Sequence, residues 1–96
     1  MIVTMLEAEV VEERASELVS SFRSGSGPLP PPIRESFLLR ESGTESWRVL
    51  TVWESREALD SYRASVDTPG GVLMFRSAGA EPVLTVFEVE AHADHK

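Results

Sequence analysis

Hydrophobic and polar residues follow two different periods in the first part of the chain. The segment Ile2 to Val10 is rich in residues that favour β-structure and has no helical period, which predicts a strand. From Glu12 the apolar residues recur at i, i+3, i+4 and i+7, which predicts an amphipathic helix that Gly25 ends. The apolar positions of this helix are Ala15, Leu18, Val19 and Phe22.

The middle of the chain predicts a hairpin that follows a linker. The stretch Ser24 to Pro32 consists largely of glycine, serine and proline, which can neither continue a helix nor join the interior of a sheet. Two strand-like runs follow, Ile33 to Glu41 and Trp47 to Trp53. The segment between them, Ser42 to Ser46, contains a glycine suited to a turn, so the two strands are expected to be neighbours.

A second helix is predicted directly after this hairpin. Ser55 is a favourable N-cap, and Glu57 lies in the first turn, where a negative charge is stabilised. Leu59, Tyr62 and Val66 follow at helical spacing.

The last third of the chain predicts one further strand. Residues Asp67 to Pro69 can start a helix, whereas the two glycines that follow weaken it, so Val72 to Ser77 is either a turn or a short helix. Val83 to Glu90 is an apolar run of strand length. The polar tail Ala91 to Lys96 is expected to be loose.

These elements predict one α+β domain spanning residues 1–96, with a core over about residues 1–90 and a flexible tail over residues 91–96. The order β-α-β-β-α-β is that of a ferredoxin-like fold, in which two helices cover one face of a four-stranded antiparallel sheet.

Both faces of the predicted sheet are apolar. Val49 and Trp53 point to one face of their strand, while Leu50 and Val52 point to the other. Two helices cover only one face, and a large exposed apolar face is unusual for a monomer. We therefore expect a homodimer in which the second faces meet to form a two-protomer α+β barrel.

Composition narrows the possible partners. The chain has 9 basic and 16 acidic residues and a formal net charge of −7, with arginines spread along its length, so nucleic acid is not an expected partner. There is no cysteine, which excludes disulfides and thiolate chemistry. No apolar run approaches the roughly 20 residues of a membrane helix, and the N-terminal residues lack the basic start of a signal peptide. A cytoplasmic location with no membrane partner is expected.

The run from residue 47 to residue 65 resembles a known family. A strand ends in Trp-Glu-Ser and is followed, after one residue, by Glu-Ala and an apolar position, carried here by Trp53, Glu54, Ser55, Glu57, Ala58 and Leu59. This pattern resembles the antibiotic biosynthesis monooxygenase (ABM) domains of the dimeric α+β barrel superfamily. The resemblance implies the fold described above and extends over about residues 1–90. Its members include enzymes that oxidise polyketide anthrones with dioxygen and no cofactor, quinol monooxygenases and haem-degrading monooxygenases.

Several of these residues have both a structural and a functional interpretation. Trp53 either fills the space between sheet and helix or, as the resemblance implies, lines a pocket for an aromatic substrate. Tyr62 either packs in the core or supplies a hydroxyl to the pocket. Arg76 either extends to solvent or faces an anionic oxygen. Glu54 and Ser55 are best explained by helix capping.

The chain also differs from the family pattern. It contains no asparagine and no glutamine, whereas the cofactor-independent and haem-degrading members use a pocket asparagine. Its two histidines, His92 and His95, lie in the tail and not after the second helix, where the haem-degrading members place their iron ligand. We therefore expect no cofactor, with haem disfavoured, and no metal site.

The leading hypothesis is a small cofactor-independent monooxygenase acting on an aromatic or quinol-type, polyketide-like compound. The alternative is a non-catalytic dimeric barrel that binds a hydrophobic small molecule, which the scarcity of polar pocket groups favours. No catalytic residue is assigned. The candidates for the substrate pocket are Trp53, Tyr62, Phe22, Met74, Phe75 and Arg76.

Overall fold

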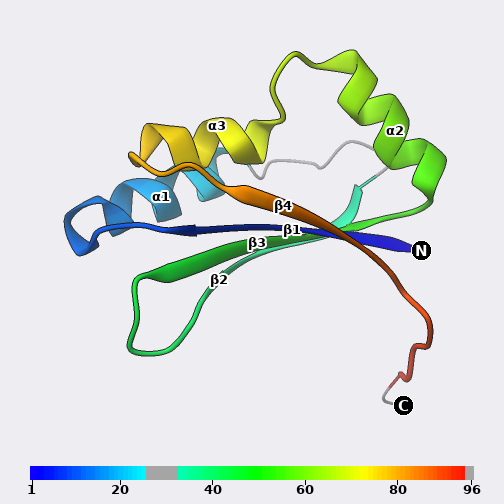
Figure 1. Ribbon diagram of the computed structural model, residues 1–96, viewed down its shortest axis with the longest axis horizontal. Coiled ribbons are helices and arrows are strands. Elements are labelled where there is room, and N and C mark those ends of the chain that lie inside the picture. The colour runs from blue at the N-terminus through cyan, green and yellow to red at the C-terminus, as the bar shows by residue number, and fades with distance from the viewer. Residues whose placement is uncertain (26–32, 95–96) are drawn as a thin grey trace.

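The backbone follows the polarity pattern of the sequence, and the computed structural model describes it for residues 1–25 and 33–94. Within these ranges the elements follow the order β-α-β-β-α-α-β (Figure 1). They are β1 (Ile2–Glu9), α1 (Glu12–Gly25), β2 (Ile33–Arg40), β3 (Ser46–Trp53), α2 (Arg56–Ser65), α3 (Gly70–Ser77) and β4 (Val83–Glu88).

The strands form one antiparallel sheet in the order β2-β3-β1-β4. β2 and β3 make the expected hairpin, and Gly43 in its turn has a φ of 76°, a conformation that glycine adopts without steric cost. β1 lies in the middle, where Thr4 pairs with Thr51 of β3 on one side and with Val86 of β4 on the other. This sheet, with helices on one face, confirms the ferredoxin-like α+β prediction.

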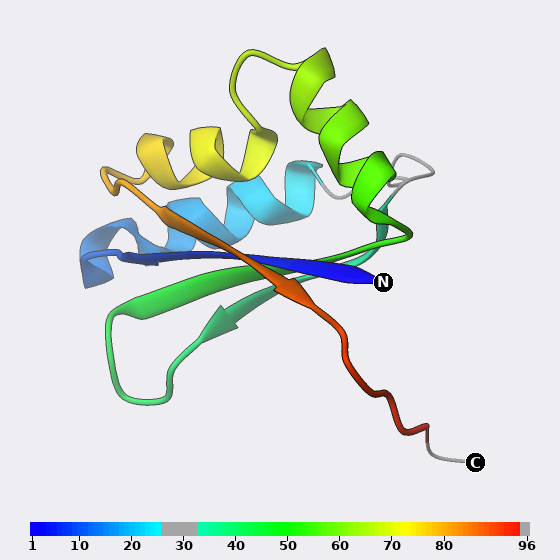
Figure 2. The same cartoon turned by 45° about the vertical axis from the view of Figure 1, so that its right-hand side comes forward.

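The three helices that the structure describes lie on the same face of the sheet (Figure 2). α1 buries Ala15 and Leu18 against it, as the helical spacing predicts. α2 begins where Ser55 caps it, because the Ser55 side chain accepts a hydrogen bond from the backbone N–H of Ala58 at 3.1 Å. α1 and α3 run beside each other, and α2 stands apart from them at the other end of the sheet (Figures 1 and 2).

Residues 72–77, which the sequence leaves as a turn or a short helix, belong to the helix α3, which begins at Gly70. The backbone N–H groups of Val72 and Leu73 donate to the carbonyl of Pro69, and Phe75 is fully buried. Burial of this ring outweighs the cost of two glycines, about 1 kcal/mol each in a helix. A Cβ at Gly71 would come within 2.7 Å of Cδ1 of Leu6, so the glycine lets α3 approach β1 closely.

The ends of the elements differ slightly from the predicted ones. The last strand ends at Glu88 and not at Glu90, although the N–H of Val89 still donates to the carbonyl of Met1 at 3.1 Å. Residues 26–32 of the predicted linker and residues 95–96 of the predicted tail lie outside the described residues. The core bounds of about residues 1–90 stay a prediction.

The buried residues form two separate clusters on the helix side of the sheet. The larger lies under α1 and α3 and includes Val10, Leu18 and Phe75, all almost completely buried. The smaller lies under α2 and consists of Ile2, Trp53 and Leu59. The core of this small domain is therefore divided, and the space between its two parts positions the candidate site.

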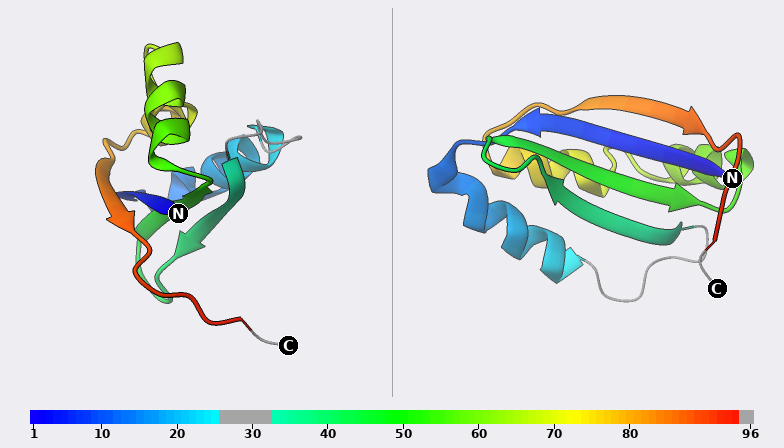
Figure 3. Two further views of the ribbon diagram at one scale, coloured as in Figure 1. Left: turned by 90° about the vertical axis from the view of Figure 1, so that its right-hand side faces the viewer. Right: turned by 90° about the horizontal axis from the view of Figure 1, so that it is seen from below.

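On the other face of the sheet, the described part of the chain places no helix (Figure 3). Strand alternation and register place a second set of apolar side chains there, which confirms that both faces are apolar. We call this set the open face. Its apolar members are Val3, Met5, Phe37, Leu39, Leu50, Val52, Val83 and Phe87. Phe37 and Phe87, on the two edge strands, are 45% and 46% exposed.

None of the helices in residues 1–25 and 33–94 is long and apolar enough to cross a membrane. The same residues contain no group of three or more histidine, aspartate or glutamate side chains that could hold a metal ion. His95 of the tail lies outside them.

Candidate functional site

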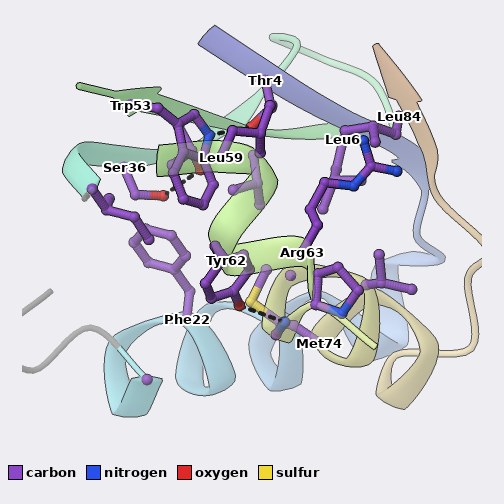
Figure 4. A pocket seen from close by; sticks show the side chains of 18 of the residues that line it. Thr4, Leu6, Phe22, Ser36, Trp53, Leu59, Tyr62, Arg63, Met74 and Leu84 are labelled. Carbon is purple, nitrogen blue, oxygen red and sulfur yellow. Dashed lines mark hydrogen bonds between the residues drawn. The ribbon is translucent and has the colours of Figure 1, made fainter. Parts of the chain in front are cut away.

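A cavity of about 400 Å³ lies between the helices and the sheet. Its floor comes from all four strands and its walls from α1, α2 and α3 (Figure 4). Leu6 and Val49 belong to the larger core cluster, whereas Trp53 and Leu59 belong to the smaller one, and all four line the cavity. The cavity therefore occupies the gap between the two parts of the core.

Trp53 is held in the cavity wall by burial and by a hydrogen bond. It is the last residue of β3 and points to the helix face, where it is 4% exposed. Its indole Nε1 donates a buried hydrogen bond to Oγ1 of Thr4, on the adjacent strand β1, at 3.0 Å. A buried indole N–H needs such a partner, and the bond fixes the orientation of the ring.

Helix α2 places Tyr62 against this indole. Leu59 and Tyr62 are three residues apart and therefore share a face of the helix. The rings of Tyr62 and Trp53 have centroids 5.2 Å apart and an interplanar angle of 49°. The Tyr62 hydroxyl accepts a hydrogen bond from the N–H of Gly70 at 3.2 Å, which ties α2 to the start of α3.

The polar groups of the cavity are few. Oγ of Ser36 and Oγ1 of Thr51 lie 3.1 Å apart and share a hydrogen bond across β2 and β3. One hydroxyl donates within such a pair, so the proton of the second can turn to a ligand oxygen. The hydroxyls of Thr4 and Tyr62 and the guanidinium of Arg63 also belong to residues lining the cavity. The remaining lining is mainly apolar.

Four of the six candidates from the sequence line this cavity, namely Trp53, Tyr62, Phe22 and Met74. Phe22 also lines a smaller hollow of about 290 Å³ beside Trp47, under α1. The Trp47 indole N–H is buried and has no hydrogen-bond partner among the described residues.

Phe75 and Arg76 do not line the cavity. Phe75 points into the larger core cluster, because one residue along α3 turns the side chain by about 100° away from Met74. Arg76 is exposed and pairs with Glu81, with 2.7 Å between Nη2 and Oε1. The hydrogen bond from Arg76 holds the pKa of the Glu81 carboxyl below its ordinary value. Neither residue is placed to contact a ligand in this cavity.

Sequence reasoning overlooked Arg63 and the cluster of hydroxyls. Arg63 follows Leu59 by four residues, the same spacing that puts side chains on one helical face, so its place beside Leu59 was open to prediction. Thr4, Ser36 and Thr51 alternate with open-face residues on three strands. Only the register of those strands brings the three hydroxyls together.

Solved structures share the fold over nearly the whole chain. SnoaB from Streptomyces nogalater, described as a cofactor-independent oxygenase, is 19% identical with a TM-score of 0.68, covering 98% of each chain. MhuD from Mycobacterium tuberculosis, described as a haem degrader and solved with two haems in its active site, is 26% identical with a TM-score of 0.70. That alignment covers 98% of this chain and all of MhuD.

The haem-bound neighbour contradicts the expectation of no cofactor, with haem disfavoured. That expectation considered histidine alone as the iron ligand, whereas tyrosine and methionine also ligate haem iron in proteins. Tyr62 and Met74 both line the cavity. Haem binding is therefore possible for a protein of this fold.

Sequence comparison identifies the family. Among curated proteins, no sequence matches this chain significantly. A sequence model of the antibiotic biosynthesis monooxygenase family matches residues 1–68, which hold the Trp-Glu-Ser pattern, the centre of the sheet and α2. The chain belongs to the antibiotic biosynthesis monooxygenase family.

Proposed function

We propose that the chain is a monooxygenase that oxidises a flat aromatic or quinol-type small molecule held against Trp53. The observation that carries this proposal is the apolar cavity in the divided core, with an orientationally fixed indole in its wall. Family membership and the oxygenase and haem-degrading neighbours support a monooxygenase-type reaction. The apolar and aromatic lining of the cavity supports an aromatic substrate.

The volume and lining suit an aromatic ligand. About 400 Å³ is within the range of small-molecule pockets, which are mostly apolar and carry a few polar groups that fix orientation. The rings of Trp53 and Tyr62 present two differently inclined aromatic surfaces, so a flat substrate can stack on one and meet the edge of the other.

The chemistry that this cavity favours is oxidation of an electron-rich carbon beside an ionisable hydroxyl or carbonyl. In the simplest case a CH₂ group between aromatic rings and one dioxygen give a carbonyl and one water, which balances without a further reactant. The protein has to exclude bulk water and stabilise the substrate oxyanion. Hydroxyl donors such as those of Ser36 and Thr51 do this more effectively in apolar surroundings than in water.

Haem is a second candidate ligand, favoured by the 26% identical haem-bound neighbour. Tyr62 or Met74 would be the iron ligand on this chain, since both line the cavity and both residue types ligate haem iron. Bound haem would supply redox-active iron and a flat aromatic macrocycle. The aromatic lining that suits a quinol also suits that macrocycle.

We further propose that two copies pair through the open face. A chain of this size cannot cover both faces of its sheet with three short helices, and the remaining apolar side chains span all four strands. Burying this face against its equivalent gives a self-complementary two-fold interface. The cavity lies on the helix side and stays accessible in such a dimer.

Dioxygen uptake with a panel of anthrones and hydroquinones tests the activity. We expect uptake dependent on the protein, and a Trp53→Phe change should lower ligand affinity or turnover tenfold or more, about 1.4 kcal/mol. The affinity should fall because phenylalanine offers a narrower stacking surface. The free energy of unfolding should fall by only about 1–2 kcal/mol in urea titrations, because the ring stays and one hydrogen bond, to Thr4, is lost. Trp47→Phe is the matched control and should retain binding and turnover, because Trp47 lies outside the cavity. Binding without uptake would instead favour the non-catalytic binding protein, and equal effects of both changes would remove Trp53 from the site.

Light scattering should give about twice the chain mass of 10.6 kDa at micromolar concentration. Phe37→Glu places a charge on the open face and should convert the dimer to a monomer. Leu73→Glu is the control, since Leu73 is 52% exposed on α3, on the helix side of the sheet. A monomeric wild type, or a Phe37→Glu variant that remains a dimer, would contradict the proposed interface.

Haemin titration should produce a saturable shift of the Soret band if haem occupies the cavity. Tyr62→Phe and Met74→Leu each remove one candidate iron ligand, the phenol oxygen or the thioether sulfur, with little change in side-chain volume. The variant that lacks the actual iron ligand should show the smaller shift of the Soret band. An absorbance change that never saturates in the wild type would remove haem as a candidate. Identical spectra for wild type and both variants would place haem elsewhere on the chain.

A further inference from the structure

The charge on the cavity has the opposite sign to the charge on the chain. All 16 acidic residues lie within the described ranges, and none of them lines the cavity. Among the described lining residues the only charged side chain is that of Arg63. In a chain with a net charge of −7, which repels anions in general, the described lining of the candidate site thus carries one positive side chain and no negative one.

Arg63 also differs from most other arginines in having no acidic partner within residues 1–25 and 33–94. Five arginines of the described chain form ion pairs with aspartate or glutamate, namely Arg14, Arg40, Arg48, Arg56 and Arg76. One of them, Arg56, pairs with Asp60 on the same helix as Arg63. Arg63 forms no ion pair with any residue that the structure describes, so its guanidinium donors remain available to a ligand.

The position of Arg63 gives the cavity two chemically different ends. In Figure 4 the Arg63 side chain extends toward Leu84, on the opposite side of the cavity from Phe22 and Ser36. The aromatic walls are made by Trp53 and Tyr62. A ligand whose rings lie against these walls can direct one substituent toward the guanidinium.

We propose that Arg63 binds an acidic substituent of the substrate, so that this protein prefers aromatic acids to neutral aromatics of the same shape. The proposal rests on the function proposed above and names the substrate class for the same cavity. A guanidinium matches a carboxylate with two parallel N–H···O bonds, and a phenolate with one. Arg63 is itself exposed, so water weakens the simple charge attraction, and the directed N–H···O bonds have to carry the preference. Arg63 is a specificity-determining residue and takes no part in the oxidation.

A structural role for Arg63 makes a different prediction. The residue lies in the last turn of α2, where a cation stabilises the helix dipole. That role depends on charge at the helix end and is independent of any ligand. Discrimination between a charged and a neutral ligand of the same shape therefore separates the two roles.

The test uses two tricyclic probes, anthraquinone-2-carboxylate and its neutral analogue 2-(hydroxymethyl)anthraquinone, with affinities measured by calorimetry on the full chain. The wild type should bind the carboxylate at least tenfold more tightly than the alcohol. Arg63→Gln should weaken carboxylate binding at least tenfold and leave alcohol binding within twofold, and loss of the cation at the helix end should lower the melting temperature by only a few degrees. Arg63→Lys should retain part of the preference, because it keeps the charge and loses the planar fork.

Arg56→Gln is the matched control, since it removes a cation from the same helix at a position outside the cavity, and its carboxylate preference should equal that of the wild type. Equal affinity of the wild type for both probes, or a preference that survives in Arg63→Gln, would overturn the role of Arg63 and leave the aromatic site standing. Loss of the carboxylate preference in Arg56→Gln as well as in Arg63→Gln would show that the preference comes from the overall charge of the chain, and would overturn the proposal. Failure of both probes to bind would overturn the site and this inference together.

Discussion

The hydrogen bond from the indole of Trp53 to Thr4 is the interaction on which the site depends. It holds a large flat side chain, buried in the smaller core cluster, in one orientation where β3 ends and α2 begins. Tyr62 packs on that indole and is tied in turn to Gly70, so the positions of α2 and the start of α3 are linked to the sheet through two aromatic rings. The larger cluster under α1 and α3 closes the core at the other end. The gap between the two clusters is the cavity, so the packing that stabilises the fold also defines the site.

The helices were predictable because apolar residues recur at helical spacing in α1 and α2, and the strands because β-favouring or apolar runs of strand length lie between segments with other signals. Alternation along its strand placed Trp53 on the same face as Val49, and helical spacing placed Tyr62 and Leu59 on one face of α2, but neither signal said which sheet face the helices cover. The side-chain directions in α3 were not predictable from sequence, because Val72, Leu73, Met74 and Phe75 are all apolar and give no amphipathic phase. Only packing shows that Met74 faces the cavity while Phe75 enters the core. The same limit applied to Arg76, which pairs with Glu81 at the surface, and to the threonines and serine that strand register brings together.

A divided core and an uncovered sheet face are two consequences of one constraint, which is that a chain of 96 residues has little apolar surface to distribute. Residues that line the cavity do not pack against one another across it, and no helix of the described residues covers the open face. Pairing with a second copy would bury the open face without closing the cavity, because the two lie on opposite sides of the sheet. The proposed oxidation and the proposed contact with Arg63 would then take place in a cavity that the dimer interface leaves open.

The two tryptophans allow a direct measurement of where a ligand binds. The indole N–H of Trp53 is bonded to Thr4 in the cavity wall, whereas that of Trp47 is buried under α1 without a partner among the described residues. In a ¹⁵N-labelled sample each gives its own indole resonance, which a Trp47→Phe sample assigns. Titration with anthraquinone-2-carboxylate should move the Trp53 resonance saturably and leave the Trp47 resonance almost unchanged. If the ligand binds but moves only the Trp47 resonance, or neither resonance, the assignment of the cavity as the functional site is contradicted.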